Sequence, residues 1–238
     1  MDVLQLIADQ SQPPNISALH KMCDLTRPTL YRILASLESE GLISQTPDKH
    51  YKLGARLVVL ARKVLAENDV RTLARPELEQ LRDATGETVH LAIKSGNELV
   101  YIDKIESRQI VRMASDIGTR VPFHSTAVGK AYMSALGEQS TDALVTSLNL
   151  EKVTQFTTTN PRELLKKVSK ARAQKYVFDD QENEIGIVCY GAPILDATGS
   201  PAASVSISVP VFRHESETTH YTKPLLAHVG KISELLGY

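Results

Sequence analysis

Cysteine and tryptophan are scarce in this sequence of 238 residues, which contains two cysteines and no tryptophan. Cys23 and Cys189 fall in segments that we assign to different domains, so we expect no structural disulfide and a reducing compartment. The sequence also lacks a Cys-x-x-Cys motif and any paired spacing of His and Cys, which are typical of zinc sites. We therefore predict no metal site and no cofactor.

Long apolar runs and an excess of one charge are absent as well. No run approaches the roughly 18 to 20 residues that span a bilayer, and the N-terminus has neither the basic nor the apolar region of a secretory signal. We therefore expect a cytoplasmic protein that binds no membrane. The net charge is −1, and 42% hydrophobic and 23% charged residues are typical of a globular protein with one large or two smaller domains.

What the sequence does have is a segment, residues 16–34, that is typical of two short helices joined by a tight turn. The Ser17 side chain can cap a helix that runs to about Cys23, because it can accept a hydrogen bond from a free N–H group of the first turn. Thr26 can cap a second helix in the same way, with Pro28 in the first turn, where a missing N–H costs nothing. Helix-turn-helix proteins use this arrangement to put the second helix into the major groove of DNA.

The second helix has one apolar side and one polar side. Four apolar residues recur at the spacing of a single helical face: Leu30, Ile33, Leu34 and Leu37. The other side carries the residues that we predict to contact DNA: Arg27, Pro28, Thr29, Tyr31 and Arg32. Of these, Arg27, Thr29 and Arg32 are expected to bond bases or nearby phosphates.

A short hairpin is predicted after this helix. Gly41 suits the left-handed residue that ends the helix, and residues 42–53 can form two strands around a turn. We interpret the hairpin as a wing whose Lys49 and Lys52 contact the DNA backbone. Alternatively, residues 1–53 form a small helical bundle whose hairpin packs on something other than DNA.

The N-terminal part of the chain has only a small net positive charge. Residues 1–63 contain eight Lys or Arg and six Asp or Glu, a net charge of +2, whereas the remaining residues contain 19 and 22, a net charge of −3. Counterion release on DNA binding scales with the number of phosphates neutralised, so a weak charge favours an assembly that doubles the contacts. We therefore predict a homodimer or homotetramer on double-stranded operator DNA.

The sequence predicts three parts: a winged helix-turn-helix in residues 1–53, a linker helix region in residues 54–75 and an effector-binding domain in residues 76–238. Within the large domain, a hairpin is predicted in residues 88–105. The other expected elements are strands at 110–114, 187–194 and 202–209 and helices at 125–136, 140–148, 161–174 and 216–236. Because these elements lack the regular crossovers of a nucleotide-binding sheet, we predict an α+β fold with a mostly antiparallel sheet.

Two segments of this domain can meet at a small anionic ligand. Ser125 can cap a helix whose first free N–H groups can bind a carboxylate or a phosphate: those of Thr126, Ala127 and Val128. In residues 203–209 serine alternates with apolar residues, which places three hydroxyls on one sheet face: Ser204, Ser206 and Ser208. A serine face can also simply contact water, but its combination with the helix start favours a ligand site.

Two further residues allow more than one interpretation. Cys189 lies in an apolar strand and is by itself a small buried hydrophobe, and Asp179 is by itself part of a solvated acidic loop. If Asp179 lines the pocket, it repels a second carboxylate and favours an acid that also carries hydroxyl groups. An enzyme with Cys189 as nucleophile, His124 as base and Asp179 as orienting group is an alternative, although a thiol among apolar residues is normally inert. A sensor that signals through a protein partner is another.

Three segments, in this order and spacing, resemble the IclR family of bacterial transcriptional regulators: residues 27–34, residues 121–131 and residues 179–208. The resemblance implies an N-terminal winged helix-turn-helix, a linker helix and a C-terminal GAF-like α+β domain that binds a small acid. Within the family, residues 99–105 and 124–130 are similar to regulators of sugar-acid catabolism, such as those that respond to 2-keto-3-deoxygluconate.

The resemblance also implies the members of the effector site. By position they are Ala127, Val128, Asp179, Cys189, Ser206 and Ser208, with apolar walls from Ile110, Met113, Val121 and Ile187. Glyoxylate-responsive members have Gly-Ala where this chain has Ala127 and Val128, and the added methyl groups change the shape of the pocket without removing the N–H donors. We therefore predict a DNA-binding repressor of a catabolic operon that a small organic acid controls, and not an enzyme.

Overall fold

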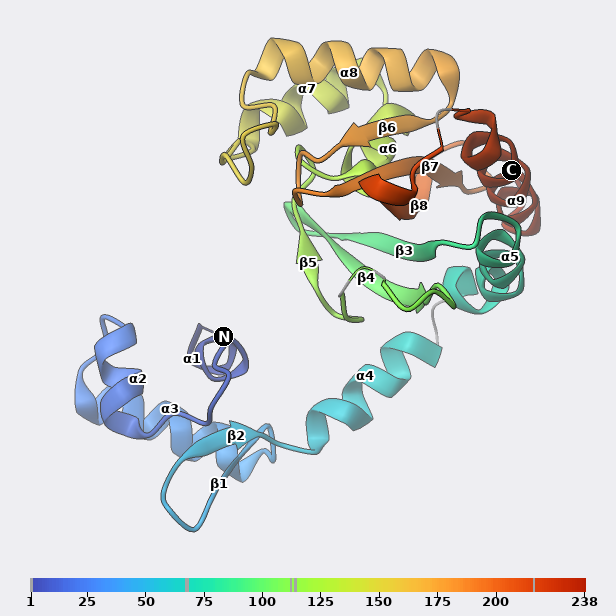
Figure 1. Ribbon diagram of the computed structural model, residues 1–238. Helices are drawn as coiled ribbons and strands as arrows, with labels where there is room; N and C mark the ends of the chain where they lie inside the picture. Colours follow the sequence, from blue (N-terminus) through green and yellow to red (C-terminus); the bar gives the residue numbers. More distant parts are fainter. Residues whose placement is uncertain (1, 67–68, 112, 114, 216) are drawn as a thin grey trace. The chain divides into compact units, whose positions relative to one another are not determined.

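The computed structural model describes residues 2–66, 69–111, 113, 115–215 and 217–238. The chain divides into two compact units, Met1–Asn68 and Asp69–Tyr238 (Figure 1). None of the helices in the described residues is long and apolar enough to cross a membrane.

The N-terminal unit contains the predicted helix-turn-helix and wing. Its elements are α1 (Asp2–Ala8), α2 (Ile16–Met22), α3 (Arg27–Ser39), β1 (Ile43–Gln45), β2 (Tyr51–Leu53) and α4 (Arg56–Ala66). β1 and β2 pair antiparallel, with Ser44 opposite Lys52. The apolar side of α3 turns inward: Leu30 and Leu34 join a buried core with residues of α1, α2 and the wing, and Ile33 and Leu37 pack against it.

The predicted cap of α2 is wrong. The helix begins at Ile16, and its N-cap is Asn15, whose Oδ1 accepts a hydrogen bond from the backbone N–H of Ala18 at 2.9 Å. Ser17 is therefore already inside the first turn. Thr26 does precede α3, but its hydroxyl lies 2.9 Å from that of Thr29 and caps no backbone N–H.

The start of α4 is fixed against the end of α3. Gly41 has the left-handed φ of +67° that was expected after the helix. The backbone N–H of Gly54 donates to the carbonyl of Leu42 at 2.8 Å, and a Cβ on Gly54 would lie 2.1 Å from the carbonyl oxygen of Gly41. Arg56 donates to the Glu40 carbonyl at 2.8 Å and pairs with the Glu40 carboxylate. Only glycine at position 54 permits this close approach.

The C-terminal unit is an α+β domain around one antiparallel sheet of six strands. Its elements are α5 (Asp69–Thr85), β3 (Thr88–Ser95), β4 (Glu98–Ile105), β5 (Arg120–Val121), α6 (Ala127–Ala135), α7 (Glu138–Ser147), α8 (Pro161–Gln174), β6 (Val177–Asp180), β7 (Ile187–Leu195), β8 (Pro201–Pro210) and α9 (Thr219–Leu235). The strand order is β5-β4-β3-β8-β7-β6. The α+β class and the antiparallel sheet are thus confirmed.

Helices cover both faces of this sheet. α5 and α9 pack on each other and on one face, where α9 contacts β7 and β8 and α5 contacts β3 and β4. α6 packs on β7 and β8 from the other face, with α8 beside it and α7 against α8 (Figure 1). The sheet is therefore buried on both sides, and its central strands are apolar on one face and polar on the other.

One predicted strand does not form, and one strand of the structure was not predicted. No strand forms in the described residues of 110–114, which are 110, 111 and 113; residues 112 and 114 lie outside the described residues. Ile110 and Val111 have the β-branched shape that favours strands, but their side chains are exposed and no neighbouring strand pairs with them. The short strand β5 takes the edge beside β4 instead. In the acidic segment interpreted as a solvated loop, Val177–Asp180 form the edge strand β6.

Candidate functional site

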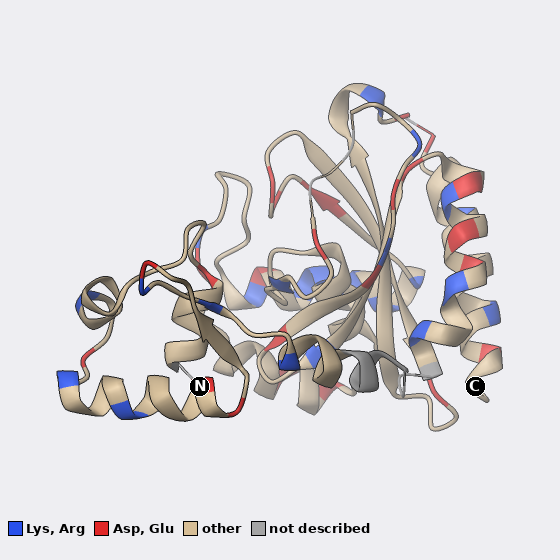
Figure 2. Cartoon of the chain, turned by 90° about the horizontal axis from the view of Figure 1, so that it is seen from below, with Lys and Arg blue, Asp and Glu red and all other residues tan. Residues whose placement is uncertain are grey.

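The polar side of α3 is exposed as the sequence predicts. The five predicted DNA contacts of this helix all have exposed side chains: Arg27, Pro28, Thr29, Tyr31 and Arg32. Lys49 and Lys52 are exposed on the wing, and Figure 2 marks the basic positions of the unit in blue. These side chains thus have no role in the core of the unit and are available to a partner.

Hydrogen bonds fix the shape of the wing. Lys49 adopts a left-handed φ of 60° at the turn, and its N–H donates to the carbonyl of Thr46 at 2.9 Å. The Thr46 hydroxyl accepts a bond from the His50 N–H at 3.1 Å. The N–H of Tyr51 donates to the carbonyl of Pro14 at 2.8 Å, which ties β2 to the segment before α2. The turn therefore holds Lys49 at the tip of the wing.

In the C-terminal unit, strand register brings polar residues from four strands onto one sheet face. Asp179 of β6 lies opposite Cys189 of β7, and Cys189 lies opposite Ser208 of β8. Ser206 lies opposite His90 of β3. All three serines of β8 are buried, so the alternative of a serine face in contact with water is wrong.

α6 begins above this polar face. Its N-cap is Thr126 and not Ser125: the Thr126 hydroxyl accepts a bond from the N–H of Gly129 at 3.1 Å, whereas the Ser125 hydroxyl donates to Oδ1 of Asn183 at 3.1 Å. The N–H groups of Ala127 and Val128 make no hydrogen bond to any residue that the structure describes. The helix therefore presents two free donors at its positive end.

A small cavity lies where α6 meets this sheet face. It has a volume of about 20 Å³, and its lining comprises Tyr101, Met113, Thr126, Ala127, Val128, Asp179, Asn183, Glu184, Ile187 and Cys189. Six of the ten residues predicted for the effector site are thus brought together. A volume of this size holds one water-sized group, so only one end of a ligand fits inside.

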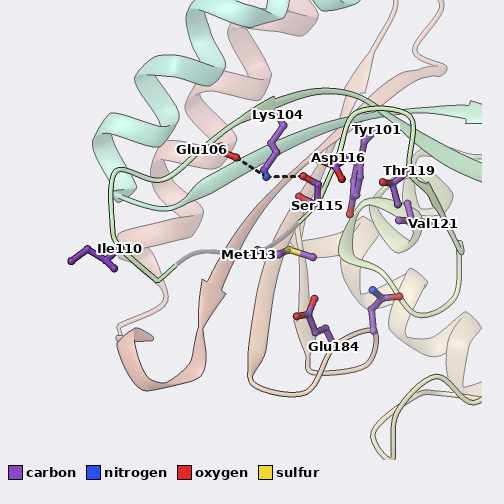
Figure 3. A pocket seen from close by; sticks show the side chains of 11 residues that line it. Tyr101, Lys104, Glu106, Ile110, Met113, Ser115, Asp116, Thr119, Val121 and Glu184 are labelled. Atoms are coloured by element: carbon purple, nitrogen blue, oxygen red, sulfur yellow. Dashed lines mark hydrogen bonds and ion pairs between the residues drawn. The ribbon is translucent and has the colours of Figure 1, made fainter. Parts of the chain in front are cut away.

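A wider pocket of about 740 Å³ shares four lining residues with the small cavity: Tyr101, Met113, Asn183 and Glu184. Its other lining residues are Lys104, Glu106, Ile110, Ser115, Asp116, Thr119 and Val121 (Figure 3). Ile110 is 96% exposed and points away from the other side chains. Ser206 and Ser208 line neither space; Ser208 lies behind Cys189, whose Sγ is 3.4 Å from its hydroxyl.

Asp179 has unusual surroundings for a carboxylate. Its side chain is almost fully buried, and Oδ1 accepts a bond from the N–H of Glu182 at 3.0 Å. Oδ2 lies 3.1 Å from Nζ of Lys130 but makes no well-oriented hydrogen bond. Burial raises the pKa of Asp179, and the charge of Lys130 opposes that rise. Oδ2 is thus paired with one cation and still has a lone pair that can accept a further hydrogen bond.

Lys130 and Glu182 form a buried ion pair that sequence reasoning missed. Nζ of Lys130 lies 2.5 Å from Oε1 of Glu182, which Nζ of Lys167 approaches at 3.0 Å. The N–H of Thr158 donates to Oε2 of Glu182 at 3.0 Å. Burial alone would raise the pKa of Glu182, but these contacts lower it. Lys130 lies in residues 121–131, one of the segments that resemble the family. Only the folded structure, however, shows that its partners are Asp179 and Glu182.

His90 is a second residue that the sequence did not single out. It is fully buried, with Nε2 at 2.7 Å from the Ser115 hydroxyl and Nδ1 at 3.4 Å from the Ser208 hydroxyl. Its ring stacks on Tyr101 at a centroid distance of 4.6 Å. Burial, together with the charge of Lys104, lowers the pKa of His90 to about 3, so the ring is neutral. In the sequence, only the alternation of residues along the predicted strand could have indicated that His90 lies on the same sheet face as other polar residues.

The geometry argues against a cysteine nucleophile. Burial and the nearby Asp179 raise the pKa of Cys189 to about 12, so the thiol stays protonated. Nε2 of His124 bonds the carbonyl of Glu151 at 2.8 Å, and Sγ of Cys189 bonds Ser208 instead. Within the described residues, no group of three or more His, Cys, Asp or Glu is placed to hold a metal ion.

Comparison with known proteins finds matches for both the N-terminal and the C-terminal unit. Residues 62–234 match the family model for the bacterial transcriptional regulator IclR C-terminal, and residues 1–47 match that for the IclR helix-turn-helix domain. The HTH-type transcriptional regulator XynR of Escherichia coli (strain K12) is 32% identical over 240 residues, covering 100% of this chain and 95% of that protein. The HTH-type transcriptional regulator KdgR of Dickeya chrysanthemi is 31% identical, covering 99% and 78%. The crystal structure of the Thermotoga maritima IclR superposes with a TM-score of 0.78 and 34% identity, covering 100% and 96%.

Proposed function

This chain belongs to the IclR family of bacterial transcriptional regulators, and on that premise we propose that it represses a catabolic operon in the cytoplasm under the control of a small hydroxylated organic acid. In this proposal α3 and the wing bind the operator. The pocket beside α6 binds the acid, and its occupancy favours one arrangement of the paired DNA-binding units over another.

The DNA-binding role is supported by the separation of the two sides of α3. Its apolar residues pack in the core, while Arg27, Arg32 and their polar neighbours have exposed side chains. Arginine can bond a guanine in the major groove with two hydrogen bonds, and lysines on a wing can pair with phosphates. We therefore propose Arg27, Thr29 and Arg32 as contacts to bases or nearby phosphates and Lys49 and Lys52 as backbone contacts.

Arg32→Ala tests this assignment. We expect the variant to bind a duplex from its own promoter region about 1 to 3 kcal/mol more weakly, because a bidentate contact is lost. Fluorescence anisotropy at several fixed salt concentrations measures the affinity. Arg162→Ala removes the same charge from an exposed position of the C-terminal unit and should leave the affinity unchanged. If wild type binds no duplex at any salt concentration, the protein signals through a protein partner instead.

One observation carries the effector proposal: the two free N–H groups of α6 and the partly unbonded carboxyl group of Asp179 line the same small cavity. A helix start binds a carboxylate readily. A nearby carboxyl oxygen accepts a hydrogen bond from a hydroxyl and disfavours a second carboxylate. A monocarboxylic acid with hydroxyl groups satisfies both, and the wider pocket has room for its remaining carbons.

Asp179→Asn tests this proposal with gluconate, galactonate and 2-keto-3-deoxygluconate as probes and hexanoate as the acid without hydroxyls. We expect calorimetric binding of at least one hydroxy acid and none of hexanoate, and about tenfold weaker binding to the variant, because the charge-assisted bond is lost. Asp142→Asn, at an exposed position of α7, is the matched control. Preferential binding of hexanoate, or equal affinity in the Asp179 variant, would contradict the proposal.

A further inference from the structure

Tyr101 of β4 lies where the small cavity and the wider pocket meet, and it lines both. It is only 5% exposed. Two other buried tyrosines of this unit have bonded hydroxyl groups: that of Tyr190 bonds Nε2 of His214 at 2.8 Å, and that of Tyr221 accepts from the N–H of Glu215 at 3.2 Å. Within the part of the chain that the structure describes, the Tyr101 hydroxyl has no such bond. Because buried tyrosine hydroxyls normally find a partner, this one indicates a ligand that supplies it.

Contacts of the ring and of the backbone fix the direction of this hydroxyl. The Tyr101 ring stacks on His90 at a centroid distance of 4.6 Å, and the backbone N–H of Tyr101 donates to the carbonyl of Thr119 at 3.0 Å. In Figure 3 the hydroxyl end of the side chain is directed toward Met113 and Glu184. Both of these residues line the small cavity and the wider pocket. The hydroxyl therefore faces the space that a ligand would fill.

Tyr101 and Asp179 offer opposite hydrogen-bonding functions. Burial raises the pKa of the Tyr101 hydroxyl, and the nearby Cys189 and Asp179 raise it further, so the hydroxyl keeps its proton and can donate. Asp179 is an acceptor: its Oδ2 lies 3.1 Å from Nζ of Lys130 but makes no well-oriented hydrogen bond. Both residues line the small cavity. A ligand group that accepts one hydrogen bond and donates another suits this pair.

The small cavity also indicates where the carboxylate of an acid would lie. The unbonded N–H groups of Ala127 and Val128 are on its lining and suit a carboxylate. Since a volume of about 20 Å³ holds only one end of a ligand, the carboxylate fills the cavity and the next carbon lies at its mouth. Tyr101 belongs to the mouth, because it also lines the wider pocket. A substituent on that carbon is therefore next to the Tyr101 hydroxyl.

We propose that the effector is a 2-hydroxy acid, and that Tyr101 and Asp179 recognise the hydroxyl group on the carbon next to its carboxylate. This inference rests on the proposed function and assigns a position to one of the ligand's hydroxyl groups. Tyr101 donates to the oxygen of that hydroxyl, and the hydroxyl donates to Oδ2 of Asp179. A ligand without this hydroxyl leaves both groups unbonded. A carbonyl in its place can accept from Tyr101 but has no proton for Asp179.

Calorimetric titration with gluconate and 2-deoxygluconate, and with galactonate and 2-deoxygalactonate, tests the proposal, because the members of each pair differ only in the 2-hydroxyl group. We expect wild type to bind at least one parent acid, and to bind it at least tenfold more tightly than its deoxy partner. Tyr101→Phe keeps the ring that stacks on His90 but removes the hydroxyl. It should weaken binding of the parent acid about tenfold and leave binding of the deoxy acid unchanged.

The comparison within each pair separates ligand contact from a structural role, since a damaged pocket would bind both acids more weakly. Tyr132→Phe is the matched control. It removes a hydroxyl from a buried tyrosine of α6 that lines neither the small cavity nor the wider pocket, and it should bind both acids like wild type. Equal melting temperatures establish that the variants are folded.

Three results would overturn the proposal. They are equal affinity of wild type for a parent acid and its deoxy partner, equal weakening of both acids by Tyr101→Phe, and binding of 2-keto-3-deoxygluconate with no binding of gluconate or galactonate. Each of these leaves the proposed function intact, because the pocket still binds a hydroxylated acid. If none of these hydroxylated acids binds, the proposed function itself is contradicted, and this inference fails with it.

Discussion

His90 illustrates how burial controls the charge of one side chain. The folded protein lowers its pKa to about 3 from an ordinary value of 6.5, chiefly by burial. Between these two pH values, His90 binds a proton in the unfolded chain but not in the folded protein. Acid therefore favours the unfolded state, and the contribution of His90 to stability is present above pH 6.5 and lost as the pH falls.

We expect the free energy of unfolding to decrease as the pH is lowered from 6.5 toward 3, with His90 contributing up to about 1.4 kcal/mol per pH unit. His90→Gln cannot take up this proton, so its stability should depend less on pH. Urea denaturation at a series of pH values measures the slope. His220→Gln, on the exposed surface, should keep the wild-type slope. A variant at position 90 with that same slope would show that another group dominates.

The sequence could identify some residues of the pocket and not others. Asp179 and Cys189 were found because their segments resemble a family, and Ala127 because a helix start was recognisable. His90 was missed because its partner Ser208 is 118 residues away, and only the register of β3 on β8 brings them together. The cap errors at Ser17 and Ser125 arose where two capping residues stand close together, so a shift of one or two residues changed the choice.

Close contact of α6 with β7 sets the position of the free N–H groups. A Cβ on Gly191 would lie 2.6 Å from the carbonyl oxygen of Ala127, and one on Gly129 would lie 2.3 Å from that of Phe123. Both obstacles are backbone atoms, which cannot move aside as a flexible side chain does. Glycine at these positions therefore lets the helix start approach the strand that carries Cys189.

Gly191→Ala should separate α6 from β7. We expect a loss of about 1 to 3 kcal/mol in the free energy of unfolding, as in other overpacked cores. Gly230→Ala, in the middle of α9, meets nothing within 4 Å and should be neutral or stabilise by up to about 1 kcal/mol, because alanine favours helix. Chemical denaturation of both variants gives the comparison. Equal stabilities would mean that α6 can shift without cost.

Helices and hairpins were predictable because their signals are local. The helical spacing of apolar residues in α3 and their alternation with polar residues in β3 and β4 are each visible within about a dozen residues of sequence. The order of strands cannot, since β8 lies between β3 and β7 although more than a hundred residues separate it from β3. The strand expected at 110–114 failed for the same reason: Ile110 has the right propensity but no strand beside it.

In a single chain, α4 has apolar side chains that are exposed to solvent. Val58 is 71% exposed and Val59 is 68% exposed, and Leu60 beside them is also exposed. Burying such residues against a second copy stabilises an assembly by roughly 25 cal/mol per Å² of apolar surface. A dimer would also double the small positive charge of the N-terminal part, which by itself neutralises few phosphates. We infer that α4 contributes to a homodimer, and that operator binding depends on it.

The double variant Val58→Glu and Val59→Glu tests this inference, since two buried carboxylates without partners would oppose association. We expect light scattering after size exclusion to report a monomer, and operator affinity to fall by at least tenfold because two half-sites are no longer bound together. Val153→Glu introduces a charge at an exposed valine of the C-terminal unit and should leave both measurements unchanged. If the double variant remains a dimer and binds the operator with wild-type affinity, α4 does not form the dimer interface, and the C-terminal units are then the candidates for it.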